Sequence, residues 1–115
     1  MRRGEIYFVN LDPVKSGEAN KKRPAVIVSN DGANVAAERT GQGMVTVVPV
    51  TSNISRIYPF QVFLPASSTR LGRDSKAQAE QVRSVSVERL GAVIGEVPQE
   101  LMGELDEALR LHLAL

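Results

Sequence analysis

The chain of 115 residues contains no cysteine, no tryptophan and a single histidine, His112. Without cysteine there can be no disulfide, no thiolate metal site and no thiol nucleophile. One histidine is also too few for a Ser-His-acid triad or a histidine-rich metal site. The carboxylates are scattered and form no calcium-loop pattern, so the sequence predicts no metal and no cofactor. His112 falls on the apolar side of a predicted helix, and packing or a C-terminal helix position explains it better than catalysis.

Long apolar runs and a strong net charge are missing as well. No stretch of about 18 apolar residues is present and no apolar signal region follows the first residues, so we expect a soluble, cytoplasmic protein. With 14 Lys+Arg against 13 Asp+Glu, the formal net charge is only +1, and binding of a polyanion would need a local concentration of positive charge. The glycines at 41 and 43 precede a predicted strand instead of following one, which argues against a phosphate-binding loop. The length fits one domain spanning residues 1–115.

Positive charge is concentrated where Lys21, Lys22 and Arg23 lead through Pro24 into an apolar, β-branched run. Valine and isoleucine favour a strand, and proline is tolerated at the first position of a strand, where its missing N–H does least harm. Proline also restricts the residue before it to extended conformations. The sequence therefore predicts that the Arg23 guanidinium is held still at the start of a strand.

Hydrophobic periodicity predicts a mostly β fold with some α+β character. We expect strands at residues 4–9, 44–50, 60–64, 75–82 and 92–94 besides the one that starts at Pro24, one or two helical turns at 34–39, a loop at 66–74, a capped turn at 86–90 and a helix at 97–113. Asp31-Gly32 is typical of a turn, and Pro49 indicates a bulge or an edge within its strand. Residues 75–82 are rich in helix-forming side chains, but their period-two spacing favours a strand. Together these elements predict a small antiparallel barrel with a C-terminal α-helix.

Few side chains remain as candidates for chemistry. Arg23 lies at the start of a predicted strand, Glu18 lies in the polar loop before it, and Thr51 and Ser52 lie at the end of another predicted strand. A solvated surface cation explains Arg23 equally well, and a strand-end cap explains the two hydroxyls. The residues alone therefore predict a barrel with one cationic corner and leave its function open.

At these same residues the sequence resembles the MazF/PemK family of toxins from type II toxin–antitoxin systems. The resemblance covers nearly the whole chain and is carried in order by RGEIY (3–7), LDP (11–13), GE (17–18), RP (23–24), VPVTS (48–52), YPF (58–60) and EQVRS (80–84). It implies an SH3-like barrel, a homodimer, and a cognate antitoxin that plugs an RNA groove on the dimer. It also implies sequence-selective, metal-independent cleavage of single-stranded RNA by the 2′-OH, which leaves a 2′,3′-cyclic phosphate and a 5′-OH end.

By this resemblance, Arg23 matches the catalytic arginine, Thr51 the catalytic threonine and Glu18 the acid of the first loop. The family often has Gly-Ser-Glu where this chain has residues 16–18 as Ser-Gly-Glu. A plasmid-borne branch uses a loop histidine with an arginine and an aspartate, and the matching positions here are Gly17, Gln78 and Glu80. The sequence therefore resembles the Arg-Thr branch.

RNA contacts are expected from side chains around this corner. The candidates are Lys21, Lys22, Ser52, Asn53, Gln81 and Arg83. With two tyrosines and three phenylalanines, an extended stacking platform is not expected, so hydrogen bonds to base edges should carry specificity. Glu80, Gln81 and Arg83 are expected on a solvent face.

Two other functions stay open at this point. A similar barrel occurs in the CcdB-type toxins, which bind DNA gyrase and cut no RNA, although Arg23 and Thr51 would then have no assigned task. An inactive relative that keeps only antitoxin binding is the other alternative, because the first loop departs from the family pattern.

Overall fold

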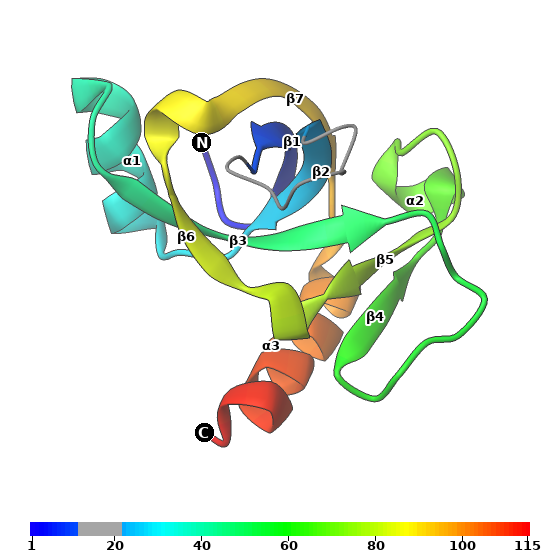
Figure 1. The fold of residues 1–115 in the computed structure, drawn as a ribbon. Helices are drawn as coiled ribbons and strands as arrows, with labels where there is room; N and C mark the ends of the chain where they lie inside the picture. The colour runs from blue at the N-terminus through cyan, green and yellow to red at the C-terminus, as the bar shows by residue number, and fades with distance from the viewer. Residues whose placement is uncertain (12–21) are drawn as a thin grey trace, which may run out of the picture.

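The computed structural model describes residues 1–11 and 22–115, so Glu18 and Lys21 lie outside the described residues. In this described part of the chain, seven strands and three α-helices follow one another in the order shown in Figure 1. They are β1 (Glu5–Asn10), β2 (Lys22–Ile27), α1 (Asp31–Thr40), β3 (Met44–Thr51), β4 (Gln61–Leu64), α2 (Ala66–Thr69), β5 (Ser75–Gln78), β6 (Arg83–Ser86), β7 (Leu90–Glu96) and α3 (Gln99–Leu113), with 3₁₀ turns η1 (Ala79–Gln81) and η2 (Val87–Arg89).

The strand pairs of the described residues are antiparallel, in the order β4-β5-β3-β2-β1-β7, with β6 also paired to β3. The expected antiparallel, mostly β fold with a C-terminal helix is confirmed, although the pairing does not run from β4 round to β7. β3 lies in the middle of the sheet. On one side it pairs with β2, and on the other side it pairs first with β6 and then with β5.

Pro49 lies at this change of partner and makes neither the bulge nor the outer edge that the sequence predicted. The pairing of β3 with β6 ends at Val47, and its pairing with β5 begins at Val50. The Thr46 carbonyl faces β2, where it accepts a hydrogen bond from Val28 N–H, and backbone groups alternate sides along a strand. Pro49 therefore turns its missing N–H toward the gap between β6 and β5, where no ladder bond is lost.

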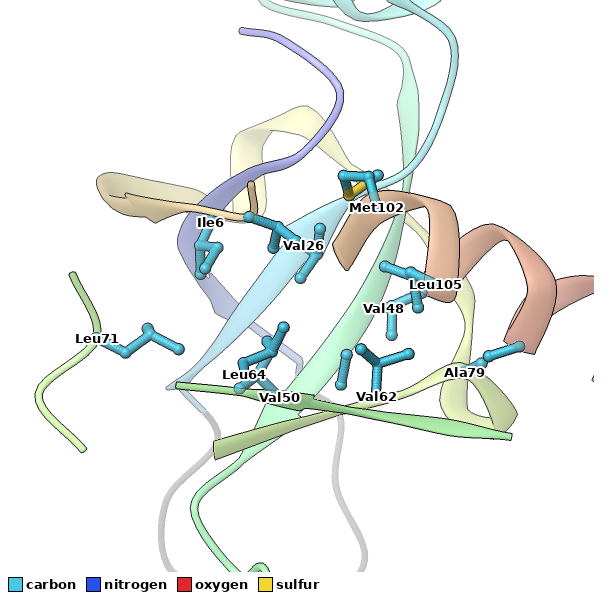
Figure 2. Close-up of a cluster of buried hydrophobic side chains, with 13 residues drawn as sticks. Ile6, Val26, Val48, Val50, Val62, Leu64, Leu71, Ala79, Met102 and Leu105 are labelled. Atoms are coloured by element: carbon cyan, nitrogen blue, oxygen red, sulfur yellow. The ribbon is translucent and has the colours of Figure 1, made fainter. Parts of the chain in front are cut away.

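One face of the sheet is buried under α3, as Figure 2 shows. The helix places Leu105 and Met102 against Val48 and neighbouring strand residues. The C-terminal helix position expected for His112 is confirmed, because it lies in the last turn, but the expected packing is wrong, because its side chain is exposed. Met102, near the start of the helix, is buried. Within the described residues, no helix combines the length and apolar character that crossing a membrane requires.

Part of the opposite face of the sheet is buried by a second hydrophobic cluster, which includes Ala37 of α1. Asp31-Gly32, expected as a turn, instead forms the first turn of this helix. Asn30 caps it by accepting a hydrogen bond from Ala33 N–H at 2.8 Å, and Gly41 ends it with a φ of 70°. The cap and the acidic first turn stabilise the helix N-terminus, which outweighs the local turn preference of Asp-Gly.

The predicted strand at 75–82 is half right. β5 ends at Gln78, and η1 carries the chain into β6, a strand that the sequence did not predict. β5 and β6 pair with the same side of β3, so the single turn of η1 is an interruption between two pieces that share one partner. The loop expected at 66–74 begins with the short helix α2, whereas the capped turn at η2 is confirmed, with the Ser86 side chain accepting from Glu88 N–H.

Candidate active site

Arg23 and Thr51 lie on the same face of the sheet. The register pairs Ala25 of β2 with Pro49 of β3, and continuing it by two residues places Arg23 opposite Thr51. Side chains alternate faces along a strand, so both residues share the face of Ala25 and Val47, which is opposite the face covered by α3. Two residues that are 28 positions apart in the sequence are thus cross-strand neighbours.

The Arg23 guanidinium is fixed by two acceptors. Its Nη2 donates to Gln78 Oε1 at 2.8 Å and to the Val50 carbonyl oxygen at 3.3 Å. Both acceptors are neutral, so within residues 1–11 and 22–115 the guanidinium is held in place by groups that carry no charge. Both bonds use Nη2, and within the described residues Arg23 Nε and Nη1 have no hydrogen-bond acceptor, so these N–H groups can donate to an anion.

Thr51 ends its strand with an ordered turn. Its Oγ1 accepts a hydrogen bond from Asn53 N–H at 3.2 Å, and Asn53 Oδ1 accepts from the Ser55 hydroxyl at 2.9 Å. The hydroxyl of Thr51 therefore acts as the strand-end cap that its position predicted. Its own hydrogen stays free to donate to an oxygen on the sheet face, so capping and a second role are compatible.

Lys76 of β5 is paired with Thr51 in register and lies on the same face. It is only 8% exposed, and its Nζ donates to the Arg56 carbonyl oxygen at 2.6 Å. The same ammonium is 6.0 Å from the centre of the Tyr58 ring. The segment that follows Thr51 is thereby tied back to the sheet beside Thr51. The burial of this lysine has no signal in the sequence.

Gln61 and Glu80 form a second link under this segment. Gln61 Oε1 accepts from Tyr58 N–H at 3.1 Å, and Gln61 Nε2 donates to Glu80 Oε2 at 2.7 Å. The solvent face expected for Glu80 is wrong, because the side chain is partly buried and its Oε1 has no hydrogen-bond partner within the part of the chain that the structure describes. The turn η1 rotates it away from the exposed positions of Gln81 and Arg83.

The other predicted contact residues do not all lie on one surface. Arg83 shares the face of Arg23, because it is paired with Val47, and its Nη1 donates to the Leu11 carbonyl oxygen at 3.3 Å. Gln81 and Asn53 are exposed, Gln81 at the end of η1 and Asn53 in the turn that follows Thr51. Ser52 lines a different pocket of about 380 Å³, and Lys22 lines a groove of about 1020 Å³ along β1 and β7. Only part of the predicted set is therefore gathered around Arg23.

Gln78 is the site residue that the residue pattern missed. In the sequence, Gln78 was noted only as a position at which a related branch has another residue. In the structure, its side-chain oxygen is the nearer of the two acceptors of the Arg23 guanidinium. His112 takes no part in this face, and across residues 1–11 and 22–115 no group of three or more potential ligands could hold a metal ion. An anchored guanidinium beside a hydroxyl is an arrangement that binds a phosphate group and stabilises negative charge developing on it.

Comparison with known proteins identifies the family of the chain. The model of the PemK-like, MazF-like toxin of type II toxin–antitoxin systems matches residues 2–113. The chain belongs to this family. The resemblance drawn from the motifs is thus confirmed over almost the full length of the chain.

Two named relatives match the MazF-like chain over its whole length. Endoribonuclease MazF9 of Mycobacterium tuberculosis is 60% identical over 115 residues, which is 98% of its own length. Endoribonuclease EndoA of Bacillus subtilis is 32% identical and is covered to 96%. Both names describe enzymes that cut RNA, so the gyrase-binding alternative is not favoured.

Solved structures agree with the sequence relatives. The chain of a mycobacterial endoribonuclease in complex with its cognate antitoxin superimposes with a TM-score of 0.76 at 25% identity, and the match covers 100% of the MazF-like chain and 96% of that chain. MazF from Deinococcus radiodurans gives a TM-score of 0.74 at 28% identity, with 100% and 97% covered. The barrel of the family is therefore the fold of this protein.

Proposed function

We propose that this protein is a sequence-selective endoribonuclease toxin that cuts single-stranded RNA in the cytoplasm as a single catalytic domain of residues 1–115. One observation supports the proposal above the others. Arg23 and Thr51 share a face of the sheet, and among the described residues the Arg23 guanidinium is held by two neutral acceptors. The full-length relatives named endoribonucleases support the same reaction.

The reaction uses a nucleophile that RNA itself carries. The ribose 2′-OH loses its proton, its oxygen attacks the adjacent phosphorus, and the bond from phosphorus to the 5′ oxygen breaks. The leaving 5′ oxygen takes up a proton, so the products are a 2′,3′-cyclic phosphate and a 5′-OH end. Since the substrate supplies the nucleophile, the protein has three tasks, which are two proton transfers and the stabilisation of charge on the phosphorane.

Arg23 suits the stabilisation of charge. Its planar guanidinium can donate two parallel hydrogen bonds to phosphoryl oxygens, and the Gln78 bond fixes the plane before substrate binds. The Thr51 hydroxyl can donate a further hydrogen bond to the same phosphate. Arg23 is a poor acid or base, because an arginine pKa above about 12 leaves almost no neutral form at pH 7.

Glu18 is proposed to accept or relay the 2′ proton. This role rests on the family resemblance, because the residue lies outside the described part of the chain. A carboxylate with an ordinary pKa is ionised at neutral pH and can act as a base.

RNA contacts are proposed for Arg83, which shares the face of Arg23, and for the exposed Gln81 and Asn53. The RNA is proposed to contact Lys21, Lys22 and Ser52 further along its length. Lys22 and Ser52 line separate hollows of the protein surface. Two macromolecular partners are also proposed, a cognate antitoxin and a second copy of the chain. The related mycobacterial endoribonuclease was solved with its antitoxin, which supports the first of them.

The test is cleavage of a long, unstructured RNA in the presence of EDTA, with mapping of the cut ends. We expect cuts at a recurring short sequence, with a 5′-OH on one side and a cyclic phosphate on the other. Arg23→Ala should lower the rate by roughly 10²–10³, the usual loss when one transition-state donor is removed. Arg39→Ala is the matched control, because Arg39 is an exposed arginine of α1, a helix that lies at the opposite end of the sheet from β4 in Figure 1.

Three results would overturn the proposal. Intact RNA with DNA gyrase retained on the immobilised protein would identify a gyrase-binding toxin. Intact RNA with antitoxin still bound would identify an inactive relative. Cleavage by Arg23→Ala at the wild-type rate would remove Arg23 from the mechanism.

A further inference from the structure

Three side chains form an exposed cluster in the segment between β3 and β4. The Tyr58 and Phe60 rings are stacked, with centroids 5.3 Å apart and planes 5° from parallel. The Arg56 guanidinium carbon lies 4.7 Å from the centre of the Tyr58 ring. We call Arg56, Tyr58 and Phe60 the stacking cluster. The Tyr58 ring already contacts Phe60 and Arg56, and with Tyr58 39% exposed and Arg56 exposed, the guanidinium side of this stack is accessible to solvent.

The stacking cluster belongs to the face that carries Arg23 and Thr51. Lys76 connects the two, because its backbone is paired with Thr51 and its ammonium reaches the Arg56 carbonyl oxygen and the neighbourhood of the Tyr58 ring. One side chain therefore spans the distance from the strand neighbour of Thr51 to the cluster. An RNA strand with its phosphate at Arg23 would pass within reach of Tyr58.

The cluster is also held in place before any ligand arrives. Gln61 accepts a hydrogen bond from Tyr58 N–H, and it is anchored in turn by Glu80. Lys76 fixes the backbone at Arg56. A surface that is already ordered loses little conformational entropy on binding, which is the condition under which stacking contributes to affinity.

We propose that the stacking cluster binds one unpaired base of the RNA substrate, close to the nucleotide that is cut. The inference rests on the proposed function and adds a recognition element to it. Bases that are splayed out of single strands stack on aromatic rings and on arginine planes, and the cluster offers both. Arg56 and Lys76 also place positive charge beside the stacked base, where the phosphates of that nucleotide lie.

The aromatic content of the chain argues only against an extended platform. A single stacked pair is enough to bind one base. Tyr58 and Phe60, which stand on either side of Pro59 in the sequence, form such a pair. Base-edge hydrogen bonds then supply the remaining selectivity. An apolar protein partner could also cover Tyr58 and the neighbouring Ile57, and the experiment separates this case from the proposal.

The experiment measures binding of a short, fluorescein-labelled, single-stranded RNA whose 2′ hydroxyls are methylated, so that it cannot be cut. Each base is removed in turn to give a set of abasic oligonucleotides. We expect one abasic position, next to the cut site mapped on unmodified RNA, to weaken binding to the wild-type protein about tenfold. Tyr58→Ala should weaken binding of the intact oligonucleotide by a similar factor and should be insensitive to that abasic position. Tyr58→Phe keeps the ring and should bind as the wild type does.

Two matched controls test the rest of the cluster. Arg56→Gln should weaken binding and reduce the salt dependence, whereas Arg39→Gln on α1 makes the same charge change and should do neither. Val93→Ala removes an exposed apolar side chain from β7 and should leave binding unchanged. If Tyr58→Ala does not fold, Arg56→Gln on the exposed segment provides the same comparison with the abasic set.

The proposal is overturned if Tyr58→Ala binds the intact oligonucleotide as tightly as wild type, or if the abasic penalty persists in that variant. Loss of antitoxin binding by Tyr58→Ala with unchanged RNA binding would assign the cluster to a protein partner. Failure of the proposed function gives a different result, in which wild-type protein shows the abasic effect but leaves unmodified RNA uncut in EDTA.

Discussion

Gln78 of β5 accepts a hydrogen bond of 2.8 Å from Arg23 of β2, across the intervening strand β3. The bond joins two strands that are not neighbours in the sheet, and it passes over the end of β3, where Thr51 lies. The guanidinium is thereby aligned by a neutral amide. A carboxylate at the same position would attract the guanidinium more strongly and would compete with a phosphate.

The first prediction follows from this pair. Gln78→Glu should convert the hydrogen bond into an ion pair and lower RNA cleavage about tenfold, because charge-assisted bonds are stronger than neutral ones by about 1 kcal/mol or more. Gln42→Glu makes the same charge change at an exposed position after α1 and should cleave at the wild-type rate. Cleavage rates on one RNA at fixed ionic strength measure the difference. Equal rates for both variants would show that Arg23 does not need a neutral partner.

A pair of glycines provides a test of the packing between β7 and α2. A Cβ added at Gly95 would collide with the Thr69 carbonyl oxygen, whereas a Cβ at Gly72 would meet nothing within 4 Å. Gly95→Ala should therefore destabilise the protein by about 1–3 kcal/mol, as overpacking does. Gly72→Ala should be neutral or stabilising by up to about 1 kcal/mol, since it restricts only the unfolded chain. Urea unfolding of both variants measures the two free energies, and a stable Gly95→Ala would contradict the close approach.

The contribution of α3 can be measured with two leucines of the same C-terminal region. Leu105 is fully buried against the sheet, and Leu115 is 85% exposed. Leu105→Ala should lower the free energy of unfolding by about 2–5 kcal/mol, because it leaves a cavity in the cluster of Figure 2. Leu115→Ala should change it by less than about 0.5 kcal/mol. Equal effects in chemical denaturation would mean that α3 does not pack as described.

A further prediction concerns acid. The Arg3 backbone N–H, which donates to Asp31 Oδ1 at 2.7 Å, holds the pKa of Asp31 below its usual value of 3.8, with smaller help from Asn34 and the charges of Arg3 and Arg2. The folded state thus prefers the carboxylate. Its stabilisation is present above pH 3.8 and is lost as pH falls through the lower pKa of the folded state.

Asp31→Asn should therefore be less stable than the wild type at neutral pH, and the two should converge in strong acid. The control Glu104→Gln replaces an exposed acid of α3 and should retain the wild-type acid dependence. The urea midpoint as a function of pH is the measurement. A constant difference between Asp31→Asn and the wild type at every pH would contradict the assignment.

Strand and helix content could largely be predicted from local pattern. The β-branched run of β3 and the helical period of α3 each express one preference of the chain, and the structure contains both. The errors occur where a long-range contact decides. Asp31-Gly32 becomes helical because Asn30 caps α1 and Arg3, which is distant in sequence, binds Asp31. The strand at 75–82 is interrupted because Ala77 and Arg83 pair with Val50 and Val47, which are closer together in sequence than they are, so the extra residues leave the ladder as η1.

The amino-acid sequence by itself determined the family motifs, the strand at Pro24, which the structure extends back to Lys22, and the identity of Arg23 and Thr51 as candidates, because these depend on residue type and short spacing. Only the tertiary structure decided that Gln78 aligns Arg23, that Lys76 is buried beside Thr51, and that Ser52 faces a different pocket. The physical reason is register. Which side chains meet across a sheet depends on how distant strands align, and a change of one residue in that alignment moves every side chain to the other face.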